Sequence, residues 1–198
     1  MAENLGLHAV EFLHGDLGNF SKLVPPDRKF DFISCTNTAH EMHPGCFANL
    51  FLDSLLRLSD SGELFIYDME SLTNPELGAL PWRSQEIGEL INAAFDSLQT
   101  AFRARPSAWQ HSTCRGWSVT IQRHYIGVTS EAITAKREEL AKRLEGMIDN
   151  LLNNRIRECG KVLESFCKYG ADTAEDQNAK IGALYEFWAL YHAKEMRA

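Results

Sequence analysis

The chain has 198 residues, of which 44% are hydrophobic and 24% charged, and its formal net charge is -7. This composition is typical of a soluble globular protein, and the negative charge disfavours nucleic-acid binding because it repels phosphates. No apolar run approaches the ~20 residues that span a bilayer, and the first residues lack the features of a secretion signal. We therefore expect a cytoplasmic protein without a membrane or nucleic-acid partner.

The cysteines and histidines show no metal-binding or disulfide pattern. The five cysteines are odd in number and scattered, and no pair is spaced as CxxC. This argues against a disulfide framework and a zinc knuckle. His40 and His43 stand three residues apart without an evident third ligand, so we expect no metal site.

Three short apolar stretches in the first 70 residues predict buried strands, at 9–17, 30–36 and 62–70. Between the last two, apolar residues recur at three- and four-residue steps over 44–60, which predicts an amphipathic helix. Strand, helix and strand in this order are typical of a parallel crossover unit in a sheet with helices on both faces. Such sheets bind ligands at the carboxyl ends of their strands.

The middle of the chain predicts a helix and a strand. Apolar residues keep helical spacing over 83–104, and residues 116–128 alternate as in a strand with one buried face. Residues 108–113 are a candidate hairpin partner for that strand. The expected buried face of this strand carries Trp117, Val119, Ile121, Arg123 and Tyr125. Taken as a group, the arginines of this part of the chain are interpreted as a solvated face: Arg103, Arg105, Arg115 and Arg123.

From residue 129 onward the pattern is helical. One apolar stripe runs from Ile133 to Phe166, with Ser130 as a candidate N-cap and Gly170 as a candidate stop. A helix of about 40 residues is long for a globular protein, so a break near 153–154 or 160 is an alternative. A last helix starts near Thr173. We predict a domain at 1–128 and a helical region at 129–198 that packs on itself or on a partner.

Polar side chains stand where the first three predicted strands end. Asp16 ends the first strand, Asn37 and His40 follow the second, and Asp68 ends the third. If the strands are parallel, these side chains lie along one edge of the sheet, where open α/β folds bind cofactors.

The segments "VEFLHGDL", "KFDFISCTNTAHEM" and "LLRLSDSGELFIYDME" together resemble the second half of class I S-adenosylmethionine-dependent methyltransferases. The resemblance covers about residues 8 to 70. It implies an α/β fold: a partial Rossmann-like methyltransferase sheet with helices, followed here by a C-terminal α-helical segment. In that family the sheet runs 3-2-1-4-5-7-6, and the three segments would be its third, fourth and fifth strands.

The resemblance also implies a cofactor site. Gly15 and Asp16 would contact the adenine of S-adenosylmethionine with Leu17 beside it, and Thr36 and Asn37 would lie near its methionine part. His40 would be the catalytic residue, a general base for the methyl acceptor. The structural alternatives are that Asp16 only caps a turn and that His40 only forms hydrogen bonds within its loop. We expect a small-molecule or protein acceptor, because an Asn/Asp-Pro-Pro-aromatic motif is absent.

The family's glycine-rich loop has no counterpart here, since neither GxGxG nor GxGxxG occurs in these residues. The family's strands one and two lie between strands three and four, so their absence predicts open strand edges. The first predicted strand would then pair with the second, or a homo-oligomer or partner chain would cover the edges. The alternative function is a truncated or inactive methyltransferase-fold interaction module that binds through its C-terminal helices.

Overall fold

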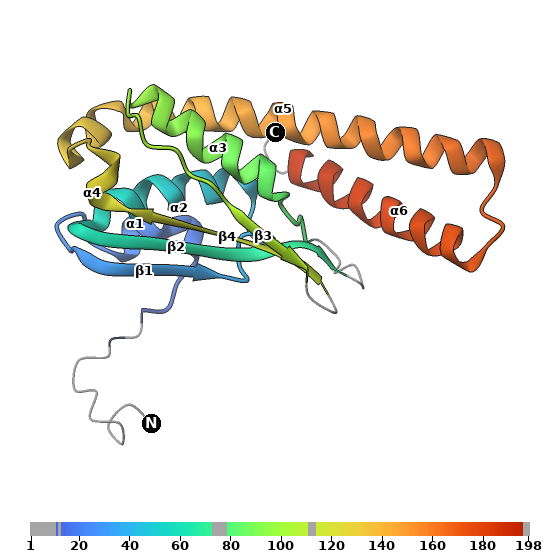
Figure 1. The fold of residues 1–198 in the computed structure, drawn as a ribbon, viewed down its shortest axis with the longest axis horizontal. Helices are drawn as coiled ribbons and strands as arrows, with labels where there is room; N and C mark the ends of the chain where they lie inside the picture. The colour runs from blue at the N-terminus through green and yellow to red at the C-terminus, as the bar shows by residue number, and fades with distance from the viewer. Residues whose placement is uncertain (1–10, 12, 73–78, 111–113, 196–198) are drawn as a thin grey trace, which may run out of the picture.

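The computed structural model describes residues 11, 13–72, 79–110 and 114–195, and these form a mixed α/β fold (Figure 1). Four strands form one sheet in the order β1-β2-β4-β3. β1 and β2 are parallel, β4 is antiparallel to β2, and β3 forms an antiparallel hairpin with β4. The strands are β1 (Phe30–Thr36), β2 (Leu58–Leu72), β3 (Ser107–Gln110) and β4 (Cys114–Gln122).

The predicted crossover unit is confirmed. β1 has the expected bounds, and α2 (Pro44–Arg57) connects it to β2. Pro44 stands in the first turn of α2, where a missing N–H costs nothing, and His43 Nδ1 accepts a hydrogen bond from the N–H of Gly45. β2 begins directly after α2, four residues before the expected start, because its first part pairs with the beginning of β1.

One face of the sheet carries the core. α2, α3 (Ser84–Ser97) and the amino half of α5 (Ser130–Tyr169) lie on this side (Figure 1). The buried strand residues alternate, as expected for a sheet with one covered face. Those of the core face are Leu64, Ile66, Trp117, Val119 and Ile121.

The expectation of helices on both faces is wrong for the described residues. Phe32 on the opposite face is 57% exposed, and Trp109 is 38% exposed although it stacks on Tyr67 with ring centroids 5.4 Å apart. The helices collect on one side because the apolar stripes of α2, α3 and α5 share a single core with the sheet. The second face therefore presents aromatic surface to solvent.

The strand predicted at 9–17 is not formed by its described residues. Residues 11 and 13–16 have no strand structure, and a short 3-10 helix, η2 (Leu17–Asn19), follows. Asp16 caps η2, because its Oδ1 accepts the N–H of Gly18 at 2.8 Å. The turn bends the chain away from β1 and into α1 (Phe20–Leu23), so β1 pairs only with β2 among the described strands. Direct pairing of the first two predicted strands is thus not observed.

The strand predicted at 116–128 ends early. β4 stops at Gln122, and the turn α4 (Arg123–Ile126) follows, closed by Gly127 with a left-handed φ of 67°. Tyr125 therefore leaves the expected buried face and is 63% exposed, whereas Arg123 is only 5% exposed and does not belong to a solvated face. The hairpin with β3 is confirmed up to residue 110, and 111–113 lie outside the described residues.

α5 is one continuous helix, without the break considered near residues 153–154 or 160. Thr129, not Ser130, is the N-cap, since its Oγ1 accepts the N–H of Ala132, and Gly170 ends the helix with φ 82°. α5 is supported along its length, because α2 and α3 pack on it and α6 (Ala174–Glu195) returns antiparallel to it (Figure 1). No helix in the described part of the chain is long and apolar enough to cross a membrane.

A substitution at Gly62 tests how closely β1 and β2 approach each other. A methyl group at this position would lie 2.7 Å from the carbonyl oxygen of Phe30 and 3.0 Å from the backbone nitrogen of Ser59. We expect Gly62→Ala to lower the free energy of unfolding by ~1–3 kcal/mol in urea denaturation. Gly146→Ala is the matched control: nothing lies within 4 Å of its added methyl in α5, so it is expected to stabilise by ~0.5–1 kcal/mol. If both substitutions changed the free energy of unfolding equally, Gly62 would not lie in close contact with the backbone of β1.

Candidate functional site at the carboxyl edge of the sheet

A tight turn follows β1 and carries three of the residues predicted for the site. The N–H of Asn37 donates to the carbonyl oxygen of Tyr67 at 3.0 Å, which continues the parallel ladder by one bond. Asn37 then adopts a left-handed φ of 51°, a conformation that asparagine tolerates better than most residues. The side chains of Thr36 and Asn37 are exposed, whereas His40 is buried.

His40 is held by Asp68, which lies on the core face of β2 and is fully buried. The carboxylate of Asp68 bonds His40 twice: Oδ2 accepts the backbone N–H at 3.0 Å, and Oδ1 lies 2.5 Å from Nδ1. It also accepts the N–H of Met69 at 2.7 Å. With Nδ1 donating to Asp68, Nε2 is the basic nitrogen of the ring. Sequence analysis placed both residues at one edge but did not foresee this pair.

Cys35 lies beside this pair and is not a nucleophile at neutral pH. Burial, and next the negative charge of Asp68, raise the pKa of its thiol to about 11. The thiolate is the reactive form of cysteine, so Cys35 acts here as a small apolar side chain on the core face.

The predicted adenine contacts lie on a separate turn. A methyl group at Gly18 would come within 2.9 Å of Cys46 Sγ, which places the turn against the first turn of α2. α2 begins just after the carboxyl end of β1, so Asp16 and Leu17 are on the same side of the sheet as His40. Gly15, Asp16 and Leu17 are exposed, and no hydrogen bond joins Asp16 to Thr36 or Asn37.

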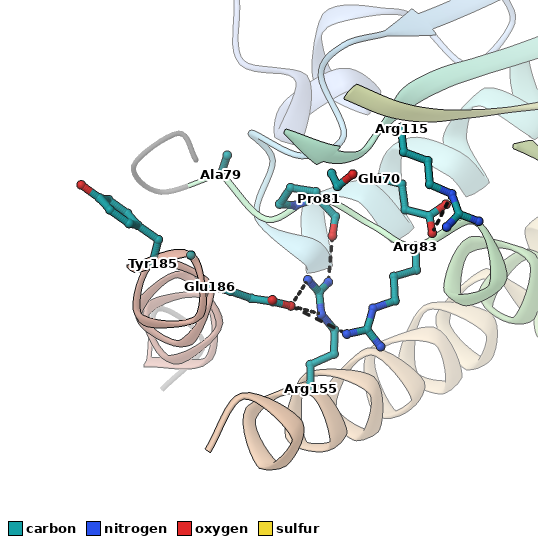
Figure 2. Close-up of a pocket in the computed structure, with 10 residues that line it drawn as sticks. Glu70, Ala79, Pro81, Arg83, Arg115, Arg155, Tyr185 and Glu186 are labelled. Atoms are coloured by element: carbon teal, nitrogen blue, oxygen red, sulfur yellow. Dashed lines mark hydrogen bonds and ion pairs between the residues drawn. The ribbon is translucent and has the colours of Figure 1, made fainter. Parts of the chain in front are cut away.

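A pocket of about 370 Å³ opens between the carboxyl end of β2 and helix α6 (Figure 2). Its walls come from five parts of the chain, which explains why no local motif indicated it. The lining residues are Glu70 and Ser71 of β2, Ala79, Pro81 and Arg83 before α3, Arg115 of β4, Arg155 of α5, and Gly182, Tyr185 and Glu186 of α6.

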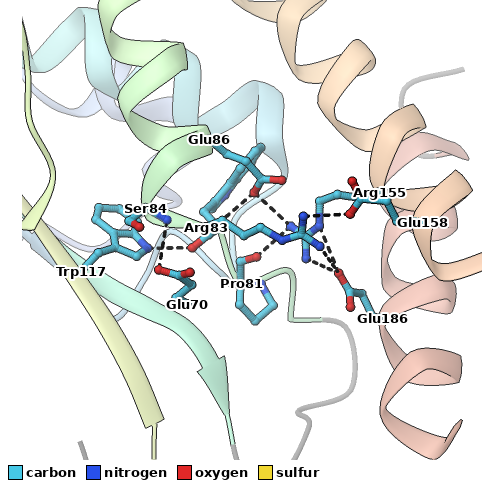
Figure 3. Close-up of polar contacts among 10 residues, drawn as sticks. Glu70, Pro81, Arg83, Ser84, Glu86, Trp117, Arg155, Glu158 and Glu186 are labelled. Carbon is cyan, nitrogen blue, oxygen red and sulfur yellow. Dashed lines mark hydrogen bonds and ion pairs between the residues drawn. The ribbon is translucent and has the colours of Figure 1, made fainter. Parts of the chain in front are cut away.

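Arg155 is the central cation of the pocket wall and is 4% exposed. Its Nη2 and Nε donate to Glu186 Oε1 at 2.6 and 3.1 Å, and its Nη1 donates to the carbonyl oxygen of Pro81 at 2.8 Å and to Glu86 Oε2 at 3.5 Å (Figure 3). A buried guanidinium is tolerated only with such partners. Arg155 thus joins α5, α6 and the start of α3.

The other charged groups of this wall are also paired. Arg83 bonds Glu158 at 2.8 Å, and Glu70 accepts the N–H of Ser84 at 3.2 Å (Figure 3). Arg115 lies 3.7 Å from Glu70 (Figure 2). Burial raises the pKa of Glu86, although Arg155 opposes the shift. The pocket therefore combines apolar surface with charged groups of both signs that are balanced by internal ion pairs.

The pocket and the His40–Asp68 pair are physically connected. The N–H of Leu80 donates to the carbonyl oxygen of His40 at 2.7 Å, and the neighbours of Leu80, Ala79 and Pro81, line the pocket. Among the described residues, no three metal-ligating side chains come together. The pocket thus adjoins the backbone of the segment that carries His40, whereas the His40 side chain is only 2% exposed and does not line the pocket.

Comparison with known proteins finds no counterpart: no family model, no curated protein and no solved structure matches this chain.

Proposed function

We propose that the chain supplies the carboxyl half of an S-adenosylmethionine-dependent methyltransferase domain that acts on a small-molecule or protein acceptor. The observation that carries the proposal is the strand order. β1-β2-β4-β3 follows the order 4-5-7-6 of that family, including the insertion of the last strand in sequence between its two predecessors. The resemblance rests on segments up to residue 70, so the order of β3 and β4 is independent support.

The proposed roles follow the carboxyl edge. Thr36 and Asn37 are exposed there and would contact the methionine part of the cofactor, while Asp16 and Leu17 would contact its adenine. His40, oriented by Asp68, would remove a proton from the molecule that receives the methyl group. The adjoining pocket would hold the methyl acceptor, and the charged residues of the pocket wall would suit polar groups on that molecule.

The proposed residues would contact the two ends of the cofactor, and none of them is assigned to its middle. No glycine-rich loop occurs in the sequence, and methyl groups at Gly15 and Gly18 would collide with Leu23 and Cys46, so these glycines serve internal packing. Among the described strands β1 has a neighbour on one side only, and its other edge and the exposed Phe32 lie where additional strands and helices would complete the site. The proposal therefore includes a second polypeptide segment that covers this edge.

A second candidate is an interaction module without catalysis. It is favoured by the same exposed aromatic face and by the absent loop, because both are compatible with a fold whose surviving role is to bind another protein. The two candidates differ in whether the carboxyl edge recognises the cofactor at all.

Ligand-observed saturation-transfer NMR with S-adenosylhomocysteine distinguishes them. For a half site we expect weak binding, with a dissociation constant on the order of 0.1–1 mM, because the loop contacts are missing. Asp16→Ala should abolish the signal. Asp27→Ala is the matched control, since Asp27 is also exposed but precedes the amino end of β1. Absence of saturation transfer to the wild-type chain at millimolar ligand would reject the methyltransferase proposal in favour of the interaction module.

A further inference from the structure

Helix α6 is apolar on two faces. One face packs on α5, with Leu190 fully buried and Phe187 partly buried in the core. α5 is its main packing partner among the described elements, and the helical hairpin extends beyond the sheet (Figure 1). The other face carries five large side chains with exposed fractions of 40–51%: Ile181, Leu184, Tyr185, Trp188 and Tyr191. A helix that is apolar all round is normally covered on both sides.

The exposed residues follow the spacing of a helix–helix seam. Ile181, Leu184, Trp188 and Tyr191 are separated by three, four and three residues, which is the a/d spacing of a heptad. We call these four residues the outer seam. Such a seam accepts another helix along its whole length, whereas a compact ligand would contact only one turn.

We propose that two copies of this chain associate through antiparallel packing of their α6 helices along the outer seam. A two-fold axis near residue 186 brings Ile181 opposite Tyr191 of the second copy and Leu184 opposite Trp188. Every layer then pairs an aliphatic with an aromatic side chain, and the same surface serves both copies, as closed two-fold symmetry requires.

The charges of α6 favour this orientation. Its first turn contains Glu175 and Asp176, and its last turn contains His192 and Lys194 together with Glu195. Antiparallel packing brings the acidic first turn of one helix near Lys194 of the other and opposes the two helix dipoles. Parallel packing would bring like charges together and would force Trp188 against its own copy.

The available area is sufficient for a reversible dimer. The five exposed side chains present on the order of 500 Å² per copy, or ~1,000 Å² for the pair, which is near the lower limit of specific interfaces. We therefore expect a dissociation constant in the micromolar range. Tyr185 borders both the seam and the pocket, so the second copy lies next to the pocket mouth.

The test is sedimentation equilibrium of the 198-residue chain over micromolar concentrations. The wild type should approach twice its monomer mass of 22.4 kDa. Leu184→Lys alone and Trp188→Glu alone should each weaken association at least tenfold, with unchanged circular dichroism. Tyr125→Glu is the matched control, because Tyr125 is 63% exposed on α4 and outside the seam; it should dimerise like the wild type.

Mixing the two seam variants tests the orientation. In the antiparallel arrangement the introduced lysine and glutamate face each other across one layer, and the other layer keeps Leu184 against Trp188. The mixture should therefore associate as a heterodimer more tightly than either variant alone, but more weakly than the wild type, because an exposed ion pair replaces an apolar layer only in part. A wild-type chain that stays monomeric, or seam variants that dimerise normally, would overturn the proposal. Failure of the mixture to recover would overturn the antiparallel register.

Discussion

Arg155→Met is expected to lower the free energy of unfolding by about 3–5 kcal/mol, the usual cost of breaking a buried ion pair from one side. The substitution leaves the carboxylates of Glu86 and Glu186 and the carbonyl oxygen of Pro81 without their shared donor. Because Arg155 links α5, α6 and the segment before α3, the loss should also loosen the pocket wall. Urea denaturation measures the difference in stability.

The matched control for this experiment is Arg157→Met, two residues along the same helix. Arg157 is exposed and, among the described residues, its side chain bonds Asn153 and Asn154 of its own helix. Its replacement should therefore change stability by no more than ~0.5 kcal/mol. Equal effects of the two substitutions would show that the Arg155 network contributes nothing beyond helix propensity.

The penalty at Arg155 should depend on pH through Glu86. Burial raises the pKa of Glu86 above its ordinary value of 4.5, so the folded chain binds this proton more tightly than the unfolded chain. The resulting stabilisation is fully present below pH 4.5 and is lost as the pH rises through the folded pKa. Without Arg155 the pKa of Glu86 rises further, so Arg155→Met should cost less near pH 4.5 than at neutral pH. A penalty independent of pH would argue against the Glu86 contribution.

Asp68→Ala is expected to destabilise the chain by about 3 kcal/mol, because it leaves several buried donors unpaired. The donors are the two N–H groups of His40 and the backbone N–H of Met69. Asp68→Asn keeps one acceptor oxygen and should cost less than the alanine variant. Denaturation in urea gives both values, and loss of saturation transfer in Asp68→Ala would additionally connect the pair to the proposed site.

Asp96→Ala serves as the control for this series. Asp96 forms an exposed ion pair with Arg103 at 2.7 Å, and exposed pairs contribute only ~0–1 kcal/mol. If Asp68→Ala cost no more than Asp96→Ala, the buried carboxylate would have an alternative arrangement, and His40 would not depend on it for its orientation.

Local patterns predicted the elements that depend on neighbours in sequence. β1 has the expected bounds at 30–36, because a short apolar run between turn signals specifies a strand. The expectation that this strand is buried is wrong, since each of its residues is half-buried or exposed at the edge of the described sheet. The helical spacing before β2 and in the last 70 residues likewise predicted α2, α5 and α6. Trp117 was correctly assigned to the core from alternation alone.

Other features depend on contacts between distant segments and escaped prediction. The segment 9–17 is apolar enough for a strand, but a strand needs a ladder partner, and its described residues turn toward α2 instead. Contrary to expectation, Tyr125 is exposed and Arg123 is buried, because β4 ends at Gln122 and the next residues form the turn α4. The assignments to the cytoplasm, to a methyl acceptor and to S-adenosylmethionine remain predictions.

The candidate site shows the same division. Periodicity and turn residues, read directly from the chain, bring Thr36, Asn37 and His40 to the carboxyl end of β1. The His40–Asp68 bond and the pocket around Arg155 join residues 28 to 74 positions apart. Such contacts form only when the sheet and helices pack, because burial and pairing energies belong to the assembled core and leave no periodic trace in the sequence.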